Sequence, residues 1–312
     1  MTEKISKNSQ ASKPFSLRSE SASSTVVGAV LLLAIIVSVF SVVRIGYIPE
    51  WKNDAEYSHM NDVWEDMADL KSKIDLMTIA LASDSDSPNT EITMSVPFHM
   101  GGGDVPLIGT IKSSGTLSVN KDECEIIINT NSEGNWTEKI DPITCGAVSY
   151  TSQNRYYVDQ DFTYEGGALI LSQGERSSMM LYPSMRFSRP ANGYDVSIHV
   201  VEIDKYKFAP SDTISSNTGC SLRLTGEEFE TLCDSDNVTS FNLTVNTDHP
   251  EAWYLYLKET MEDAKIKDYD YTLPPPTNNT VILTFPSESS SKDLNRLYVS
   301  KTIVKVEPGI GI

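Results

Sequence analysis

The chain has few basic residues for its length. Its 312 residues contain 25 Lys and Arg against 43 Asp and Glu, which gives a formal net charge of -18. Nucleic-acid binding draws most of its affinity from Lys and Arg that neutralise phosphates, so we expect no nucleic-acid partner. The acidic residues are spread along the chain rather than gathered in a tail, which is typical of a solvated, self-repelling surface.

Recognisable catalytic motifs are also lacking. The sequence has no H-E-x-x-H, no G-x-S-x-G and no G-x-x-x-x-G-K-[ST], and its four histidines are widely scattered. We therefore expect a protein that is not an enzyme and that needs neither a cofactor nor a metal. Two carboxylates that meet only in space, as in glycoside hydrolases, are the remaining catalytic alternative.

Cysteine is scarce: the chain has four, which are Cys124, Cys145, Cys220 and Cys233. No C-x-x-C pair and no neighbouring histidine is present, which argues against a zinc site. An even number of cysteines in an extracytoplasmic domain is typical of disulfides. Three connectivities are possible, and proximity along the chain favours Cys124 with Cys145 and Cys220 with Cys233.

One long apolar run stands out near the N-terminus. Residues 25–43 read TVVGAVLLLAIIVSVFSVV and carry no charge. As a helix, this run is about long enough to cross a hydrocarbon core of ~30 Å. We predict a transmembrane helix over residues 24–44, with the lipid bilayer as its partner. A cleaved secretory signal peptide is the alternative, but the sequence RIGYIP that follows is a poor cleavage site.

The charges on either side of this run give it an orientation. Lys4, Lys7, Lys13 and Arg18 precede it, whereas the far side soon becomes acidic. This bias places the N-terminus in the cytoplasm and the rest of the chain outside, in a single-pass protein of the cell membrane. Residues 1–23 are polar and are predicted to be a disordered cytoplasmic leader.

Residues 45–83 are predicted to form an amphipathic stalk helix. Its apolar residues recur at spacings of three and four, so they share one face of the helix. This stripe either packs on the protein's own domain or mediates assembly with neighbouring copies, and the sequence favours neither. The stripe consists of Met60, Val63, Met67, Leu70, Ile74, Met77 and Leu81.

Residues 90–312 change to short segments rich in Val, Ile, Thr and Tyr, separated by turn-forming residues. This pattern favours an extracytoplasmic, mainly antiparallel β-sandwich, so the fold class is α+β. A helix opening at Pro250 is expected, with Trp253, Leu257 and Met261 on one face. Expected strands cover residues 91–97, 109–119, 125–129, 146–149, 167–172, 179–182, 195–203, 238–245, 280–285 and 297–306.

Four asparagines stand in the N-x-[ST] pattern of glycosylation acceptors. A chain this rich in Asn, Ser and Thr supplies some of these patterns by chance. The predicted topology makes all four candidate glycosylation sites; they are Asn135, Asn237, Asn242 and Asn278.

The N-terminal quarter resembles archaeal pilin-like and archaellin-like surface proteins, and in particular a poorly characterised archaeal group with an SxVxGxxLL helix. The residues that carry the resemblance are the run 24–32, Ile48-Pro49, Asn53, Glu56, His59 and the run EDMADL at 65–70. The resemblance implies a class III signal: a short leader, a peptidase cut before the apolar helix, and a helix that enters a filament core or stays in the membrane. Ser21-Ala22 stands where the family usually has a basic residue followed by Gly or Ala.

The expected function is therefore that of a non-enzymatic, pilin-like cell-surface protein, anchored in the membrane and able to serve as a filament subunit. In that case other copies, or other pilin-like proteins, would be partners through the N-terminal helix. The alternative is a membrane-tethered binding or adhesion module that does not polymerise.

Overall fold

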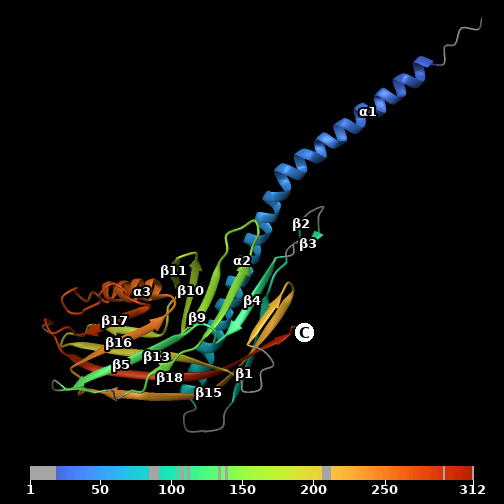
Figure 1. The fold of residues 1–312 in the computed structure, drawn as a ribbon. Helices are drawn as coiled ribbons and strands as arrows, with labels where there is room; N and C mark the ends of the chain where they lie inside the picture. Colours follow the sequence, from blue (N-terminus) through green and yellow to red (C-terminus); the bar gives the residue numbers. More distant parts are fainter. Residues whose placement is uncertain are drawn as a thin grey trace, which may run out of the picture. The chain divides into compact units, whose positions relative to one another are not determined.

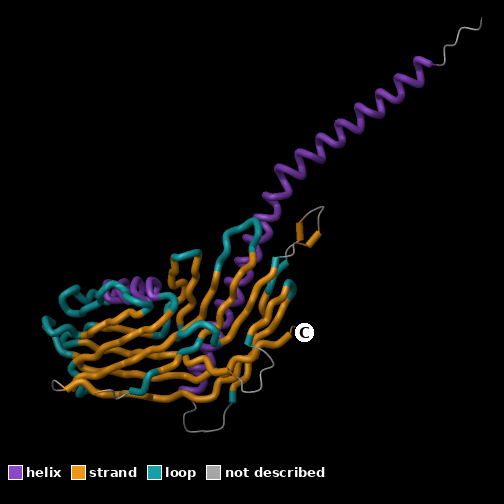
Figure 2. Tube along the Cα trace, in the orientation of Figure 1, coloured by secondary structure: helices purple, strands orange, loops and turns teal. Residues whose placement is uncertain are grey.

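The computed structural model describes residues 19–83, 91–102, 104–105, 109–110, 113–132, 135–137, 140–205, 212–290 and 292–310. The chain divides into two compact units, Met1–Trp51 and Lys52–Ile312. The first is helical, and the second combines helices with β-sheets (Figures 1 and 2). The fold class is α+β, as the sequence predicts.

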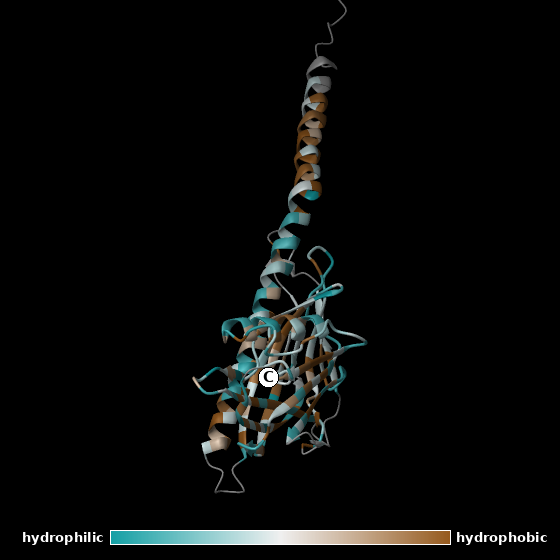
Figure 3. Cartoon of the chain, turned by 90° about the vertical axis from the view of Figure 1, so that its left-hand side faces the viewer, coloured by the Kyte–Doolittle hydropathy of each residue, from teal (hydrophilic) through white to brown (hydrophobic). Residues whose placement is uncertain are grey.

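The first unit is built on a long apolar helix. Helix α1 (Ser19–Val42) continues through a single π-turn, η1 (Val43–Tyr47), into α2 (Ile48–Ser83), and the Ile48 N–H donates to the carbonyl of Val43. Every side chain from residue 24 to residue 42 is exposed, and Figure 3 shows the hydrophobic run along the helix. Among the described residues, this is the one helix long and apolar enough to cross a membrane.

Most of the predicted leader, residues 1–18, lies outside the described residues. Helix α1 begins at Ser19, several residues before the apolar run that starts at Thr25.

The predicted stalk helix belongs to the head. From Lys52 onward, α2 lies in the second unit. All seven residues of its stripe are buried, and six of them, all but Leu81, belong to one hydrophobic cluster with strands of two sheets. At about 1.5–3 kcal/mol for each large side chain removed from water, this burial contributes on the order of 10–20 kcal/mol as an upper bound. The alternative in which the stripe mediates assembly is wrong, because these side chains are covered by the protein's own domain.

The head contains three larger sheets whose strands come from distant parts of the chain. The first has the order β1 (Ile92–His99), β15 (Gly219–Ser235), β18 (Leu294–Ile310), β13 (Tyr194–Lys205) and β12 (Met185–Ser188). The second has the order β11 (Arg176–Leu181), β10 (Ala168–Gln173), β9 (Asp161–Glu165), β8 (Ala147–Gln153), β4 (Ser114–Val119) and β14 (Thr213–Ser216).

The third sheet has the order β17 (Thr280–Phe285), β16 (Ser240–Thr247), β5 (Cys124–Ser132) and β6 (Asn135–Thr137), with β7 (Ile143–Thr144) also paired to β5. A small ribbon joins β2 (Asp104–Val105) to β3 (Gly109–Thr110). All of these strand pairs are antiparallel except β13 with β18, which are parallel. The head is thus sandwich-like and mainly antiparallel, as expected.

The described residues of the head form two hydrophobic cores. One contains the α2 stripe except Leu81; the other joins the third sheet to β13, β18 and helix α3 (Pro250–Asp263). Trp253, Leu257 and Met261 on α3 are fully buried, which confirms the helix and the face that the sequence predicts. The sequence analysis missed the short strands β2, β6 and β7, the strands β9, β12 and β14 and, most notably, the 17-residue β15.

Candidate functional site: an acidic pocket beside a buried glutamate

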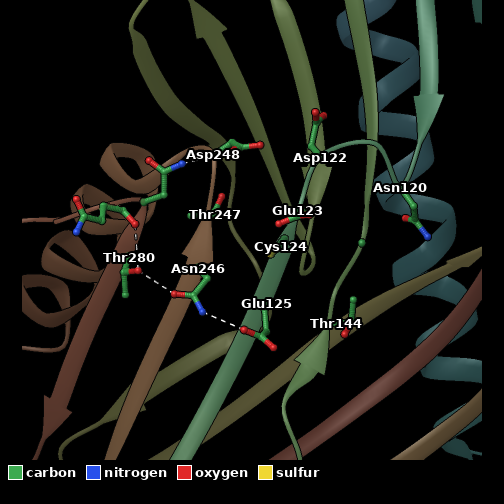
Figure 4. Close-up of a pocket in the computed structure, with 13 residues that line it drawn as sticks. Asn120, Asp122, Glu123, Cys124, Glu125, Thr144, Asn246, Thr247, Asp248 and Thr280 are labelled. Atoms are coloured by element: carbon green, nitrogen blue, oxygen red, sulfur yellow. Dashed lines mark hydrogen bonds between the residues drawn. The ribbon is translucent and has the colours of Figure 1, made fainter.

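A pocket of about 520 Å³ opens at one end of the third sheet. Because β5, β16 and β17 are antiparallel neighbours, the start of β5, the end of β16 and the start of β17 meet at this end (Figure 4). Its lining residues are Asn120, Asp122, Glu123, Cys124, Glu125, Thr144, Gly146, Asn246, Thr247, Asp248, Asn278, Asn279 and Thr280.

The pocket is strongly acidic. Four carboxylates line it, and the described lining residues include no Lys, Arg or His. One carboxylate is held in a chain of hydrogen bonds: Thr280 Oγ1 donates to Asn246 Oδ1 at 2.9 Å, and Asn246 Nδ2 donates to Glu125 Oε2 at 3.0 Å (Figure 4). The arrangement favours a cationic or hydrogen-bond-donating ligand over an anion.

Glu165 lies fully buried next to the pocket wall. Its Oε1 accepts a hydrogen bond from Thr247 Oγ1 at 2.6 Å and another from Trp253 Nε1 at 2.7 Å. Its Oε2 is buried and has no hydrogen-bond partner among the described residues. Burial raises the pKa of Glu165 to about 7, although both hydrogen bonds oppose the rise. Thr247 lines the pocket, so it links this carboxyl group to the pocket.

Two of the cysteines meet beside the same site. Cys124 and Cys145 are both buried, and the Cys145 N–H donates to the Cys124 carbonyl at 2.9 Å. The Cys145 thiol donates to the Ile143 carbonyl at 3.6 Å, and the neighbouring Cys145 side chain, together with burial, raises the pKa of Cys124. Both are free thiols in the structure. The structure therefore brings together the first pair that the sequence favours.

The second favoured pair, Cys220 with Cys233, is wrong. Both residues lie on β15, where Cys220 is opposite Ile310 and Cys233 is opposite Val299. At ~3.3 Å per residue, thirteen residues of strand separate them by roughly 40 Å, whereas a disulfide needs Cα atoms within ~7 Å. Proximity along the chain misleads here because the segment between them is extended rather than folded back.

The polar residues of the N-terminal pattern have structural roles in the head. Glu56 is fully buried, and its carboxylate accepts hydrogen bonds from the backbone N–H groups of Arg155, Tyr156 and Tyr157 at 2.7–3.2 Å. Asn53 Nδ2 donates to the Tyr156 carbonyl at 2.9 Å. These contacts fasten the loop after β8 to α2.

A second, smaller pocket of about 260 Å³ lies between α2 and the end of β1. His59 and His99 both line it, so the structure brings these two histidines together. His59 Nε2 is 2.9 Å from Tyr150 Oη, and His99 Nδ1 is 2.9 Å from Asp66 Oδ2. Burial lowers the pKa of His59 and raises that of Asp66. No group of three or more His, Cys, Asp or Glu in the described part of the chain is placed to hold a metal.

The other two histidines lie elsewhere. His199 on β13 contacts the hydroxyls of Ser300 and Thr302, and burial lowers its pKa to about 4. His249 precedes α3 and lies 3.2 Å from Ser172 Oγ. Burial lowers the pKa of His249 as well, so both side chains are mainly neutral near pH 7.

The four glycosylation candidates fall on or beside the third sheet. Asn237 and Asn278 are exposed, and Asn242 is half-buried within β16. Asn135 lies in β6, and its side chain is outside the described residues.

The fold and the apolar helix define a sandwich-like α+β head joined to a candidate single membrane span. Residues 110–307 match a family of unknown function, DUF7289, and because the match covers more than half of the chain, the protein belongs to this family. The matched region contains the acidic pocket and Glu165, but neither α1 nor α2. Neither the curated proteins nor the solved structures include a match to this chain.

Proposed function

We propose that the chain is a non-enzymatic, pilin-like cell-surface protein. Helix α1 anchors it in the membrane, and its head lies outside the cell. The observation that carries the proposal is the exposure of α1. Its large apolar side chains are 43–71 % exposed from Val26 to Val42, whereas the head completes two hydrophobic cores without them. A helix that is apolar all round needs an apolar surrounding, which a bilayer or a filament core supplies.

The burial of the α2 stripe limits how copies would assemble. Because that stripe belongs to the core of the head, α1 is the surface that remains for contact with other copies or with other pilin-like proteins. The resemblance at residues 24–32 supports this assignment, since it implies a helix that enters a filament core or stays in the membrane after a peptidase has removed a leader.

A tethered binding module that does not polymerise is the second candidate, and the acidic pocket favours it. A cavity of about 520 Å³ is within the range of small-ligand sites. In this version the span retains the protein in the membrane and the pocket recognises a cationic or hydroxyl-rich ligand.

Lysine substitutions in α1 test the anchor. Leu32→Lys with Ile35→Lys should remove the full-length protein from the alkali-resistant membrane fraction, since each Lys at the centre of a span costs about 2.5–3.5 kcal/mol. Leu76→Lys with Ile79→Lys, at exposed positions on α2, is the matched control. Equal membrane retention of both double variants would contradict the anchor.

N-terminal mass analysis of the native protein separates the two candidates. Loss of the leader near Ala22, together with recovery in sedimentable filaments, supports the pilin-like version. An intact N-terminus in detergent-soluble monomers would instead support the tethered module.

A further inference from the structure

The four N-x-[ST] patterns occur at widely spaced places in the sequence but gather at one sheet in the fold. Asn135 lies in β6 and Asn242 in β16. Asn237 precedes β16 by three residues, and Asn278 precedes β17 by two. The strands β6, β16 and β17 belong to the same sheet, so the fold brings all four patterns to one sheet.

One face of this sheet is polar and lies away from the core. Along β16, Phe241, Leu243 and Val245 are fully buried, while the intervening residues are half-exposed. Asn242 lies opposite Asn129 of β5 on this outer face. Four oxygens on or beside it have no hydrogen-bond partner among the described residues; they belong to Asn129, Asn131, Ser132 and Asn242.

The three glycosylation-acceptor asparagines whose side chains are described differ in their exposure to solvent. Asn278 is exposed in a two-residue hairpin turn, where it and Asn279 have φ angles of 48° and 61°, and the Thr277 and Thr280 backbones exchange hydrogen bonds of 3.2 and 3.0 Å. This is the geometry of a type I′ turn, which presents both side chains to solvent. Asn237 is exposed before β16, whereas Asn242 is half-buried between neighbouring strands.

We propose that Asn237 and Asn278 carry N-linked glycans and that Asn242 does not, so that sugars stand at the two ends of the outer face of this sheet. Because β16 and β17 are antiparallel, their starts lie at opposite ends, roughly 20 Å apart at ~3.4 Å per residue. Asn278 also lines the acidic pocket, so its glycan begins at the pocket rim.

The chemistry is a transfer from a lipid-linked donor. The side-chain amide nitrogen of Asn attacks the anomeric carbon of an oligosaccharide bound to a polyprenyl phosphate or pyrophosphate. The new bond joins that nitrogen to the anomeric carbon, the bond from the anomeric carbon to the phosphate oxygen breaks, and the lipid phosphate leaves. The amide loses one proton to a base of the membrane oligosaccharyltransferase. The inference rests on the proposed orientation, since such transfer takes place on the non-cytoplasmic side.

Mass spectrometry of peptides from the full-length native protein tests the inference. Peptides that contain Asn237 and Asn278 should carry an oligosaccharide mass, and the peptide with Asn242 should carry none. Asn237→Gln and Asn278→Gln should each remove one increment from the intact mass, while Asn242→Gln, the matched control with the same acceptor pattern, should remove none. Unmodified Asn237 and Asn278, or equal modification of Asn242, would overturn the proposal.

Topology is measured separately on intact cells with a membrane-impermeant amine reagent that labels lysines of the head. A head that is labelled but bears no sugar overturns the glycan assignment alone and leaves the anchored orientation intact. A head that is neither labelled nor glycosylated overturns both.

Discussion

Replacing Glu165 by Gln should change how the stability of the head depends on pH. The amide keeps an oxygen that can accept the hydrogen bonds from Thr247 and Trp253, but it cannot ionise. In the native protein this carboxyl group is fully buried, so its ionised form is costly. The variant therefore removes one proton equilibrium while leaving the packing nearly unchanged.

The magnitude follows from the pKa. Burial raises the pKa of Glu165 from 4.5 to about 7. Because each pKa unit corresponds to about 1.36 kcal/mol, ionisation of this group changes the free energy of unfolding by about 3 kcal/mol. The folded state holds this proton more tightly than the unfolded chain. Its contribution is thus fully present below pH 4.5 and is lost as the pH rises through 7.

Denaturant unfolding of the full-length protein in detergent between pH 4 and pH 9, followed by tryptophan fluorescence, measures this effect. The free energy of unfolding of the Gln variant relative to the native protein should rise by about 3 kcal/mol across this range. Glu175→Gln, at an exposed turn position, is the control and should show no such trend. Parallel pH profiles for the native protein and the Glu165 variant would refute the reasoning.

Three other changes test separate parts of the structure. Leu70→Ala, within the buried α2 stripe, should destabilise the head by about 2–5 kcal/mol, whereas Leu76→Ala on the exposed side should change it by less than ~0.5 kcal/mol; thermal unfolding would show whether they differ. Glu56→Ala should abolish hydrogen-exchange protection at the amides of residues 155–157. Unchanged protection there would contradict a role of the Glu56 carboxylate in holding this loop. Oxidised glutathione should join Cys124 to Cys145 and leave the buried Cys220 as a thiol, which alkylation after denaturation detects. Peptide mapping that finds a bridge between Cys220 and Cys233 would contradict the long β15 strand.

The spacing of apolar residues was enough to predict α2 and its buried face. Residues that recur every three or four positions show which side of a helix avoids water. They do not show what covers that side, because a bundle of copies and a sheet of the same chain bury the same stripe. Strands β1, β15 and β18, which supply much of the cover, begin 9 to more than 200 residues after α2 ends.

Strand β15 could not be predicted from local pattern. Its first half alternates, with Leu222 and Leu224 buried, but its second half is acidic and contains two register shifts. The acidic residues are satisfied by lysines from β18: Lys305 pairs with Glu227, and Lys301 pairs with Glu230 at 3.6 Å. Since those partners lie some seventy residues away, the sequence around β15 looks like a loop.

The acidic pocket likewise could not be predicted from the sequence. Its carboxylates come from the start of β5 and the end of β16, which are more than one hundred residues apart. The unusual pKa of Glu165 depends on burial under α3 and β16, and neither the single Glu nor its neighbours in sequence signals it.

The polar residues on α2 explain how an apolar stripe is held in one position. Asn53, Glu56, His59 and Asp66 continue the spacing of three and four that the apolar residues follow, so they lie on the side of the helix that faces the head. An apolar stripe alone can slide by one helical turn at modest cost. A buried Glu56 carboxylate moved by the ~5.4 Å of one turn would lose the N–H groups of three consecutive residues, and a buried charge without partners costs several kcal/mol. The N-terminal polar pattern therefore sets the register between α2 and the head. Because these residues have a structural role, the acidic pocket on the third sheet remains the candidate site for ligand recognition.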